Sequence, residues 1–275
     1  MKISCFTTMT NPEQRGDPWK EALNCYKYFF DDVVTVGEDW PEEFKFDLIG
    51  KYFQKGYDQT NSDWVFRMDI DYFFHEKDLN SLQKILYKYS EYPAIFFPQY
   101  QFFTPDRFQI KTRLAVALNK KKFSDIKFNG GGDLCLPTLK NKILHFSDLP
   151  NASIPIYQYD SLFRTKDIIA NDRARFARAW YRQFGNYGDR GGETPKVAYE
   201  AWIKMIEKKY KFHTHKINLS QHPTFIKKKL ENLEIDQFGY DAFGLANEIK
   251  RPYKNYIKGY KEKFFDFRFT NLNYR

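Results

Sequence analysis

Strand-like and helix-like segments alternate over the first 90 residues of this 275-residue chain. Short apolar runs rich in β-branched residues are separated by stretches in which apolar residues recur at helical spacing. The pattern predicts strands at 2–8, 33–36 and 64–68, and helices at about 18–30, 47–59 and 78–90. Asp17 is the expected N-cap of the first helix, with Pro18 as its first residue. Because parallel strands need crossovers of this length, the alternation favours an α/β fold with a parallel sheet and right-handed connections.

The rest of the chain follows a different pattern. Residues 92–146 are rich in aromatic side chains and interrupted by Pro98, Pro105 and three consecutive glycines, 130–132. This indicates a mixed or antiparallel part of the same sheet. After Pro155, helical spacing dominates, at about 160–184, 195–210 and 222–233. We therefore expect a core domain over residues 1–158 and a mainly helical, basic region over residues 159–275.

The composition excludes several classes of protein. With 28 Phe, 20 Tyr and 5 Trp, the chain has enough aromatic side chains to fill a large core, which argues against global disorder. Its three cysteines are odd in number and widely spaced, so we expect a reducing compartment rather than a disulfide scaffold. No apolar run approaches the length of a membrane span, and the first residues lack the features of a signal peptide. These observations predict a soluble, cytoplasmic protein.

The positive charge is concentrated towards the C-terminus. The formal net charge is +9, and residues 201–275 contain 16 Lys and Arg against 8 Asp and Glu. One interpretation is a set of solvated helix faces, which suits the run Lys227-Lys228-Lys229 inside a helix-like stretch. The other is a surface for an anionic partner, namely a membrane leaflet, a phosphorylated acceptor or nucleic acid. Charge alone leaves both open.

Polar side chains follow each of the first three predicted strands. They are Thr7 and Thr8, then Glu38 and Asp39, and then Asp69 and Asp71. Ligands of parallel α/β sheets bind beyond the carboxyl ends of the strands, where these residues are expected to lie together. The acidic pair Asp69-Ile70-Asp71 supplies oxygen ligands of the kind that Mg²⁺ or Mn²⁺ prefers, although a strand-end turn with ordinary aspartates would look the same.

A known family shares this pattern. The run SDWVFRMDID at residues 62–71 resembles the segment that contains the DxD motif in family 2 glycosyltransferases of the GT-A fold. The opening run ISCFTT and the run DVVTV at residues 32–36 are also similar to that family. The resemblance covers about residues 1–90. It implies a GT-A-type, Rossmann-like mixed sheet flanked by helices, a nucleotide-diphospho-sugar donor and a Mn²⁺ or Mg²⁺ ion.

The resemblance also implies roles for single residues in donor binding. Thr7 and Thr8 would lie near the base and ribose of the nucleotide. Where the family often has Asp-Gly-Ser, this chain has Gly37-Glu38-Asp39-Trp40, so either Glu38 or Asp39 would contact the base or ribose. Asp69 would contact the ribose or reach the metal through water, and Asp71 would bind the metal. Lys51 is a candidate partner of the diphosphate, with a solvated helix lysine as the alternative.

Inversion at the anomeric carbon, which the resemblance implies, needs a carboxylate base. Asp133 is the candidate, because it follows Gly130-Gly131-Gly132, where the backbone can approach a ligand closely. A capped glycine-rich turn is the alternative interpretation, and Asp106 is the reserve. His145 is a candidate further metal ligand, since some GT-A enzymes use a late histidine, although a core histidine is favoured. A core role is also favoured for His213 and His215 over a zinc site.

The leading hypothesis is a metal-dependent glycosyltransferase that transfers a sugar to a glycan, a lipid or another hydroxyl acceptor. It would be cytoplasmic, with peripheral contact to an anionic membrane surface as one option, and nucleic acid is disfavoured as its partner. The alternative is a basic protein that binds nucleic acid or a membrane surface and whose acidic pair is structural. A nucleotidyltransferase of related fold is less favoured, because no glycine-rich loop with Lys or Arg follows the first strand.

Overall fold

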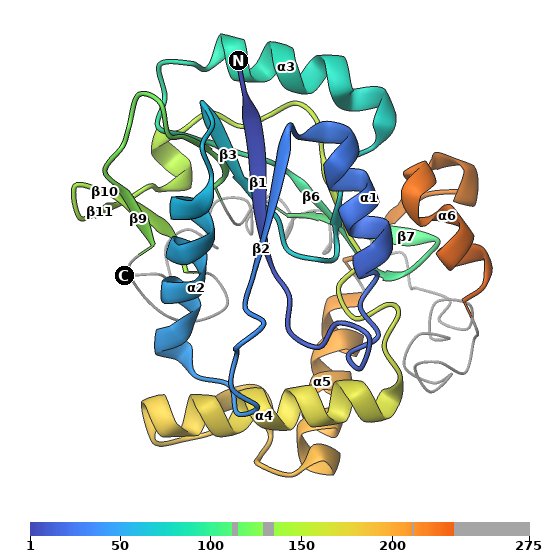
Figure 1. Ribbon diagram of the computed structural model, residues 1–275. Coiled ribbons are helices and arrows are strands. Elements are labelled where there is room, and N and C mark those ends of the chain that lie inside the picture. Colours follow the sequence, from blue (N-terminus) through green and yellow to red (C-terminus); the bar gives the residue numbers. More distant parts are fainter. Residues whose placement is uncertain (112–114, 129–134, 211, 234–275) are drawn as a thin grey trace.

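The computed structural model describes residues 1–111, 115–128, 135–210 and 212–233 (Figure 1). Its central sheet has five strands in the order β2-β1-β3-β8-β5. β1, β2 and β3 are parallel to one another, whereas β8 is antiparallel to both β3 and β5. The bounds of the strands are Ile3–Thr8 for β1, Asp32–Val36 for β2, Trp64–Arg67 for β3, Ala94–Phe96 for β5 and Ala115–Asn119 for β8. The predicted α/β fold with a mixed sheet flanked by helices is therefore confirmed.

Three helices follow the first three strands, as expected. Their bounds are Trp19–Phe29 for α1, Phe46–Gln59 for α2 and Leu79–Lys88 for α3, which the short 3₁₀ helix η1, Glu76–Asp78, precedes. The start of α1 differs from the prediction. Pro18 occupies the N-cap position, and the Asp17 side chain makes no cap but forms ion pairs with Arg15 and Arg164. The Asp17 carboxylate, which the local sequence predicts as the helix cap, is instead paired with the distant Arg164.

Helix α2 packs unusually close to β1. A Cβ atom built on Gly56 would lie 2.6 Å from Cδ2 of Phe6, which is closer than real carbon contacts allow. Phe6 is fully buried and also meets Phe53 and Phe128 at ring-centroid distances of 6.2 and 5.7 Å. A glycine at position 56 thus lets the helix approach the strand that leads to Thr7 and Thr8.

A second and a third sheet replace part of the single sheet that we expected. The second has the order β13-β7-β6-β12-β4, and the third has the order β11-β10-β9. The prediction for residues 92–146 is correct for β5 and β8 and wrong for the strands of these two sheets, since no ladder between described residues joins them to β1–β3. Their bounds are Tyr72–Phe73 for β4, Gln99–Thr104 for β6, Arg107–Lys111 for β7, Ile126–Phe128 for β9, Pro137–Leu139 for β10, Lys142–Ile143 for β11, Ile156–Gln158 for β12 and His215–Lys216 for β13.

The later helices are α4 at Lys166–Phe184, α5 at Pro195–Tyr210 and α6 at Thr224–Glu231, with short 3₁₀ helices at Phe146–Asp148, Gly188–Arg190 and Leu219–Gln221. Helix α4 begins six residues later than expected, because Thr165 caps it and residues 159–165 form a separate turn. It lies at the bottom of Figure 1, below the carboxyl ends of β1 and β2. The chain after β12 therefore returns to the edge of the sheet where the polar strand-end residues lie.

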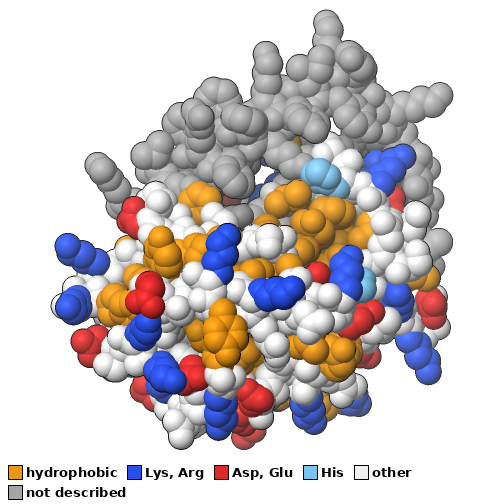
Figure 2. Space-filling view, turned by 90° about the horizontal axis from the view of Figure 1, so that it is seen from above, with side chains coloured by type: hydrophobic (Ala, Val, Ile, Leu, Met, Phe, Trp, Pro, Cys, Tyr) orange, Lys and Arg blue, Asp and Glu red, His pale blue; other side chains and the backbone are white. Residues whose placement is uncertain are grey.

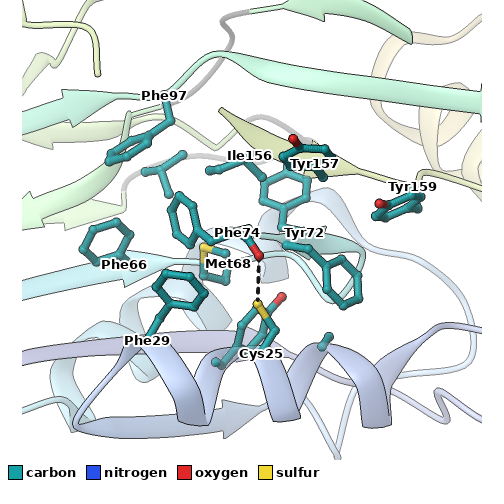
Figure 3. Close-up of a cluster of buried hydrophobic side chains, with 14 of the residues drawn as sticks. Cys25, Phe29, Phe66, Met68, Tyr72, Phe74, Phe97, Ile156, Tyr157 and Tyr159 are labelled. Atoms are coloured by element: carbon teal, nitrogen blue, oxygen red, sulfur yellow. Dashed lines mark hydrogen bonds between the residues drawn. The ribbon is translucent and has the colours of Figure 1, made fainter. Parts of the chain in front are cut away.

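The core consists of two apolar clusters. The larger one lies between α1, the central sheet and the second sheet, and Figure 3 shows Phe66, Met68 and Phe74 close together there beside α1. The Cys25 thiol points into it and donates a hydrogen bond to the Phe74 carbonyl at 3.6 Å. The smaller cluster lies between α2, the other face of the central sheet and α4. Among the described residues, no helix is both long enough and apolar enough to cross a membrane.

Candidate functional site

The carboxyl ends of β1, β2 and β3 lie at one edge of the central sheet. Thr7 pairs with Thr35 in the β1–β2 ladder, and the Met68 N–H donates to the Phe6 carbonyl at 3.0 Å. The Asp69 carbonyl accepts a hydrogen bond of 2.6 Å from the hydroxyl of Tyr26, a buried residue of α1. The backbone that leads to Asp69 and Asp71 is therefore held firmly before the chain turns into β4.

The carboxylate of Asp69 is paired with a buried arginine. Arg67 contacts both of its oxygens, at 2.9 and 3.1 Å, and the Arg67 side chain is only 4% exposed. The guanidinium carbon of Arg67 lies 4.2 Å from the centre of the Phe53 ring, so the cation is sandwiched between an acid and an aromatic face. Strand periodicity places residues 67 and 69 on the same side, which explains how the pair forms locally. The negative charge of Asp69 is therefore compensated by Arg67.

The carboxylate of Asp71 is in the opposite state. Within the described part of the chain, no side chain donates a hydrogen bond to it and no cation lies within ion-pair distance. Burial raises the pKa of Asp71 well above its ordinary value, and the neighbouring charges of Asp69 and Asp160 raise this pKa further, whereas Arg164 lowers it. An ionised carboxylate that is partly withdrawn from water and repelled by the charges of two others is unfavourable unless a cation compensates it.

Asp160 is the site residue that the sequence analysis missed. It lies two residues after the end of β12, and the intervening Tyr159 N–H donates to the Asp71 carbonyl at 3.1 Å, which ties the two strand ends together. Asp160 has a φ of 27°, which is rare for a residue with a side chain and marks a locally strained turn. The signal was present, because an aspartate after an aromatic, β-like run repeats the pattern of Asp69 and Asp71.

A chain of hydrogen bonds orients the Asp160 carboxylate. Its Oδ2 accepts from the amide of Gln101 at 3.0 Å, whose oxygen in turn accepts from Gln109 at 2.7 Å. Its Oδ1 accepts from the Ser161 hydroxyl at 3.1 Å, with Arg173 at 4.0 Å. Burial by itself would raise the pKa of Asp160, but the charges of Arg173, Arg164 and Lys111 outweigh burial and lower this pKa below its ordinary value. Asp160 is therefore an oriented and ionised carboxylate beside Asp71.

The end of β1 contains an unsatisfied hydroxyl. Thr7 is 1% exposed, and its Oγ1 is buried without a hydrogen-bond partner among the described residues. Thr8, the last residue of β1, is half-buried. The following loop is fixed to the end of β2, because the Met9 N–H donates to the Val36 carbonyl at 2.8 Å and the Thr10 hydroxyl donates to the Gly37 carbonyl at 2.7 Å. Thr7 thus has a buried hydroxyl without a partner among the described residues, near the edge where ligands of such sheets bind.

Beyond β2, the two candidate acids differ. Glu38 and Asp39 are both exposed, but Asp39 lies 3.9 Å from the Lys55 ammonium and interacts with the Tyr52 hydroxyl, both on α2. Trp40 stacks on Tyr52 with ring centres 4.5 Å apart. Asp39 is therefore engaged with α2, whereas Glu38 makes no side-chain hydrogen bond or ion pair with a described residue.

The remaining candidates lie apart from the acidic pair or outside the described residues. Lys51 is largely exposed on α2 and lies 3.8 Å from Asp47, one turn away. His145 begins a 3₁₀ turn, where its Nδ1 contacts the Ser147 hydroxyl at 2.9 Å. Asp133 lies outside the residues that the structure describes. Over residues 1–111, 115–128, 135–210 and 212–233, no three His, Cys, Asp or Glu side chains are grouped as a metal site, so His145 is not brought to Asp69 and Asp71.

The histidines near the C-terminus belong to the core or to a strand. His213 is fully buried and stacks on Phe103 with ring centres 4.6 Å apart, and His215 in β13 stacks on Phe108 at 5.1 Å. His222 is fully buried, and its Nε2 donates to the Pro105 carbonyl while its Nδ1 accepts from the Tyr159 hydroxyl, both at 2.8 Å. His222 thereby anchors the segment next to Asp160.

The arginines of α4 contact other parts of the protein. Arg178 and Arg182 both contact Glu43 in the loop after β2, and Arg175 lies 3.4 Å from Asp172 on its own helix.

On the face shown in Figure 2, basic and acidic side chains are interspersed between apolar patches. Lys227, Lys228 and Lys229 lie on α6, whose buried residues are Ile226 and Leu230, which agrees with a surface helix.

Comparisons with known proteins give distant structural matches. No protein-family model matches the chain, and no curated protein sequence matches it. Two crystal structures of S. aureus TarS 1–349, the second in complex with UDP-GlcNAc, align with 100% of this chain and 93% of their own, at 12% identity and TM-scores of 0.37 and 0.39. A third, of S. aureus TarS, aligns with 90% of this chain and 55% of its own, at 11% identity and a TM-score of 0.35. The function of the site therefore has to be inferred from its own residues.

Proposed function

We propose that this chain is a glycosyltransferase of GT-A type that transfers a sugar from a nucleotide-diphospho-sugar to a hydroxyl group of a glycan, lipid or other acceptor. The observation that carries the proposal is the Asp71 carboxylate, which follows β3 at the carboxyl edge of the parallel strands and has no hydrogen-bond or ion-pair partner among the described residues, while the charges of Asp69 and Asp160 act on it. A half-buried carboxylate without a partner fits a divalent cation, and such a cation fits a diphosphate. The residues of the site therefore suit a donor that brings phosphate and metal together.

Asp71 would hold Mn²⁺ or Mg²⁺. The ion would compensate the charge that develops on the diphosphate as it leaves. Asp69, whose charge Arg67 already neutralises, is better suited to accept hydrogen bonds from the ribose hydroxyls than to bind the ion directly. His145 as a further ligand stays a prediction, as does contact of Lys51 with the diphosphate.

The unsatisfied Thr7 hydroxyl and the unengaged Glu38 carboxylate support a nucleoside site between the ends of β1 and β2. Thr7 and Thr8 would contact the base and ribose. Of the two acids after β2, Glu38 is the better candidate for the nucleoside, since Asp39 is engaged with Lys55 and Tyr52.

A carboxylate base completes an inverting reaction. It takes the proton of the acceptor hydroxyl as that oxygen attacks C1 of the sugar, and the C1–O bond to the diphosphate breaks with its electron pair staying on the nucleotide. Asp133 stays our prediction from sequence, and Asp160 is the second candidate, because it is ionised, oriented by Gln101 and Ser161, and adjacent to Asp71. Nucleotide binding and sugar transfer are measured for Asp133→Asn and for Asp160→Asn. If both variants still bind nucleotide and only one of them loses transfer, the residue changed in that variant is the base.

Thermal unfolding in the presence of nucleotides tests the proposal without a known acceptor. A ligand that binds only the folded protein raises the unfolding midpoint by mass action. We expect one nucleoside diphosphate or its sugar conjugate to raise the midpoint only when Mn²⁺ or Mg²⁺ is present, and Asp71→Asn to abolish the shift. Asp167→Asn is the matched control, because Asp167 is an exposed aspartate in the first turn of α4.

A different result would redirect the assignment. If no nucleotide shifts the midpoint of the wild type, or if the shift survives in Asp71→Asn, the proposed metal and donor site is wrong. Retention on heparin that is sensitive to salt and unchanged in Asp71→Asn would then favour the basic binding protein. Peripheral contact with an anionic membrane and a cytoplasmic location remain predictions from sequence.

A further inference from the structure

We propose that a ring of four alternating charges, formed by Arg15, Asp17, Arg164 and Asp172, positions the donor-binding loop, and we refer to it as the α4 ring. The inference rests on the proposed function and adds four positioning residues to it. The ring joins the loop after β1, which contains residues 9–17, to the turn 160–165 and to α4. It thus connects the end of the first strand with the segment that carries Asp160.

The ring is closed, and its carboxylate oxygens are shared between the two arginines. Asp17 accepts from Arg15 at 3.1 Å through Oδ2 and from Arg164 at 2.6 and 3.0 Å through Oδ1. Asp172 accepts from Arg15 at 3.0 Å through Oδ1 and from Arg164 at 2.9 Å through Oδ2. Each arginine therefore bridges both carboxylates, which the planar fork of a guanidinium allows and a lysine does not.

The ring lies largely inside the protein. The Asp17 side chain is 4% exposed, and those of Arg164 and Asp172 are 15% and 16% exposed. Charges placed there lose much of their hydration, so each depends on its partners and the geometry is tightly defined. Since all four carboxylate oxygens are occupied by arginines, these groups are not available to bind substrate. Their role is therefore to position other groups.

Backbone packing at the ring supports the same role. Gly16 lies between two members of the ring and has a φ of 67°, in the left-handed region. A Cβ atom added there would lie 3.0 Å from the Phe163 carbonyl oxygen. The loop after β1 thus lies directly against the turn that leads from Asp160 to Arg164.

Arg164 also acts electrostatically on the candidate active site. Its positive charge acts on both Asp71 and Asp160 and lowers the pKa of each. One guanidinium is therefore fixed by Asp17 and Asp172 while it lies near the carboxylates proposed for the metal and the base. A displacement of α4 or of the loop would move this cation and the donor loop together.

Nucleotide affinity and hydrogen exchange together test the proposal. The variants are Asp172→Asn, which removes one bridging acid, Arg164→Lys, which keeps the charge without the fork, and Arg15→Gln at the most exposed corner. Asp167→Asn is the control, because Asp167 is an exposed aspartate in the first turn of α4 and lies outside the ring. Affinity is measured by calorimetry with the nucleoside diphosphate that shifts the wild type, in the presence of Mn²⁺, at a temperature well below each unfolding midpoint.

We expect Asp172→Asn and Arg164→Lys to weaken nucleotide binding by roughly tenfold or more, because displaced binding groups lose most of their pre-organisation. Asp167→Asn should bind as the wild type does. Amide exchange in residues 9–17 should accelerate in the ring variants without nucleotide, since the Arg15, Gly16 and Asp17 N–H groups bond within that loop at 3.0 to 3.2 Å. Exchange in the middle of α1 should stay unchanged.

The proposal is overturned if folded ring variants bind nucleotide as tightly as the wild type and only their midpoints fall, because the ring would then be merely structural. It is also overturned if Arg164→Lys matches the wild type, because charge alone would suffice. If the wild type binds no nucleotide, the proposed function fails. Hydrogen exchange then still decides whether the ring orders the loop. If exchange in residues 9–17 is the same in the ring variants as in the wild type, the ring does not order the loop.

Discussion

Two aspartates that are separated by a single residue in the sequence have opposite environments. Asp69 is paired at both oxygens with the buried Arg67, whereas Asp71 has no partner among the described residues and its pKa is raised, first by burial and then by Asp69 and Asp160. The folded state thus bears the cost of an ionised Asp71. Strain of this kind is typical of functional sites, where stability is sacrificed for binding.

Asp71→Asn should therefore stabilise the metal-free protein while abolishing metal-dependent nucleotide binding. A raised pKa means that ionisation of Asp71 is disfavoured in the folded state, so the wild type loses stability as the pH rises through that pKa. We expect a gain on the order of 1 kcal/mol in the free energy of unfolding at pH 8 in EDTA. The gain should vanish at a pH below the ordinary value of an aspartate. A variant less stable than the wild type at pH 8 would contradict this account.

His222 should make the protein sensitive to mild acid. Burial lowers the pKa of His222 to about 4, against an unfolded value near 6.5. The unfolded chain therefore takes up a proton first, so the stability that neutral His222 contributes is complete above about pH 6.5 and is lost as the pH falls towards 4. The loss is at most about 3 kcal/mol.

Urea unfolding between pH 7 and pH 4 measures this effect. The free energy of unfolding should fall less steeply for His222→Gln than for the wild type over that range. His145→Gln, at a half-buried surface turn, should keep the wild-type slope. Equal slopes for the wild type and His222→Gln would show that His222 is not the responsible group.

At the scale of elements, the site depends on how closely helices approach the central sheet. Helix α2 reaches β1 through Gly56, and α4 covers the strand ends through the α4 ring and through Glu43, which contacts Arg178 and Arg182. Phe176 of α4 also packs against Phe44 and Phe46 at ring-centre distances of 5.4 and 5.5 Å. Helix α4 therefore links the loops after β1 and β2, which the proposal assigns to the nucleoside.

Gly56→Ala should destabilise the protein although it favours the helix. Alanine in place of glycine ordinarily stabilises a helix interior by roughly 1 kcal/mol. Here the added methyl group would meet the Phe6 ring at 2.6 Å, and overpacking of this kind costs about 1–3 kcal/mol. We expect a lower unfolding midpoint in thermal melts. The further change Phe6→Leu should recover part of the loss. A midpoint above that of the wild type would show that α2 can move away from β1.

At the scale of the whole molecule, one apolar cluster spans both predicted regions of the chain. It contains Ile3, Cys25 and Phe66 from the first part together with Trp202, Ile206 and Leu230 from the second. Helices α1 and α6 meet through Phe225, which lies 5.5 Å from Tyr28 in ring-centre distance. The parts before and after residue 158 therefore share a core.

A fragment that ends at residue 158 should consequently fail to fold cooperatively. Its apolar cluster would lack the side chains of α5 and α6 and would be exposed to water. We expect no sigmoidal thermal transition by circular dichroism and strong binding of a hydrophobic dye, whereas the full chain unfolds cooperatively. A fragment with a cooperative transition near that of the full chain would instead show that residues 1–158 are an independent domain.

The sequence by itself determined the first three strands and helices, because their apolar periodicity is local, and it placed Thr7, Asp69 and Asp71 at the edge of the sheet. The start of α1, the division of residues 92–146 among three sheets and the position of Asp160 were decided by tertiary structure. Asp17 could cap a helix or pair with Arg164, 147 residues away, and only the folded chain selects between them. Likewise, Asp69 is compensated by an arginine, whereas Asp71 is repelled by the charges of neighbouring acids. Which of these environments an acid has depends on burial and on distant residues. Local preferences are encoded over a few residues, whereas electrostatic environments arise from contacts that the chain makes only when folded.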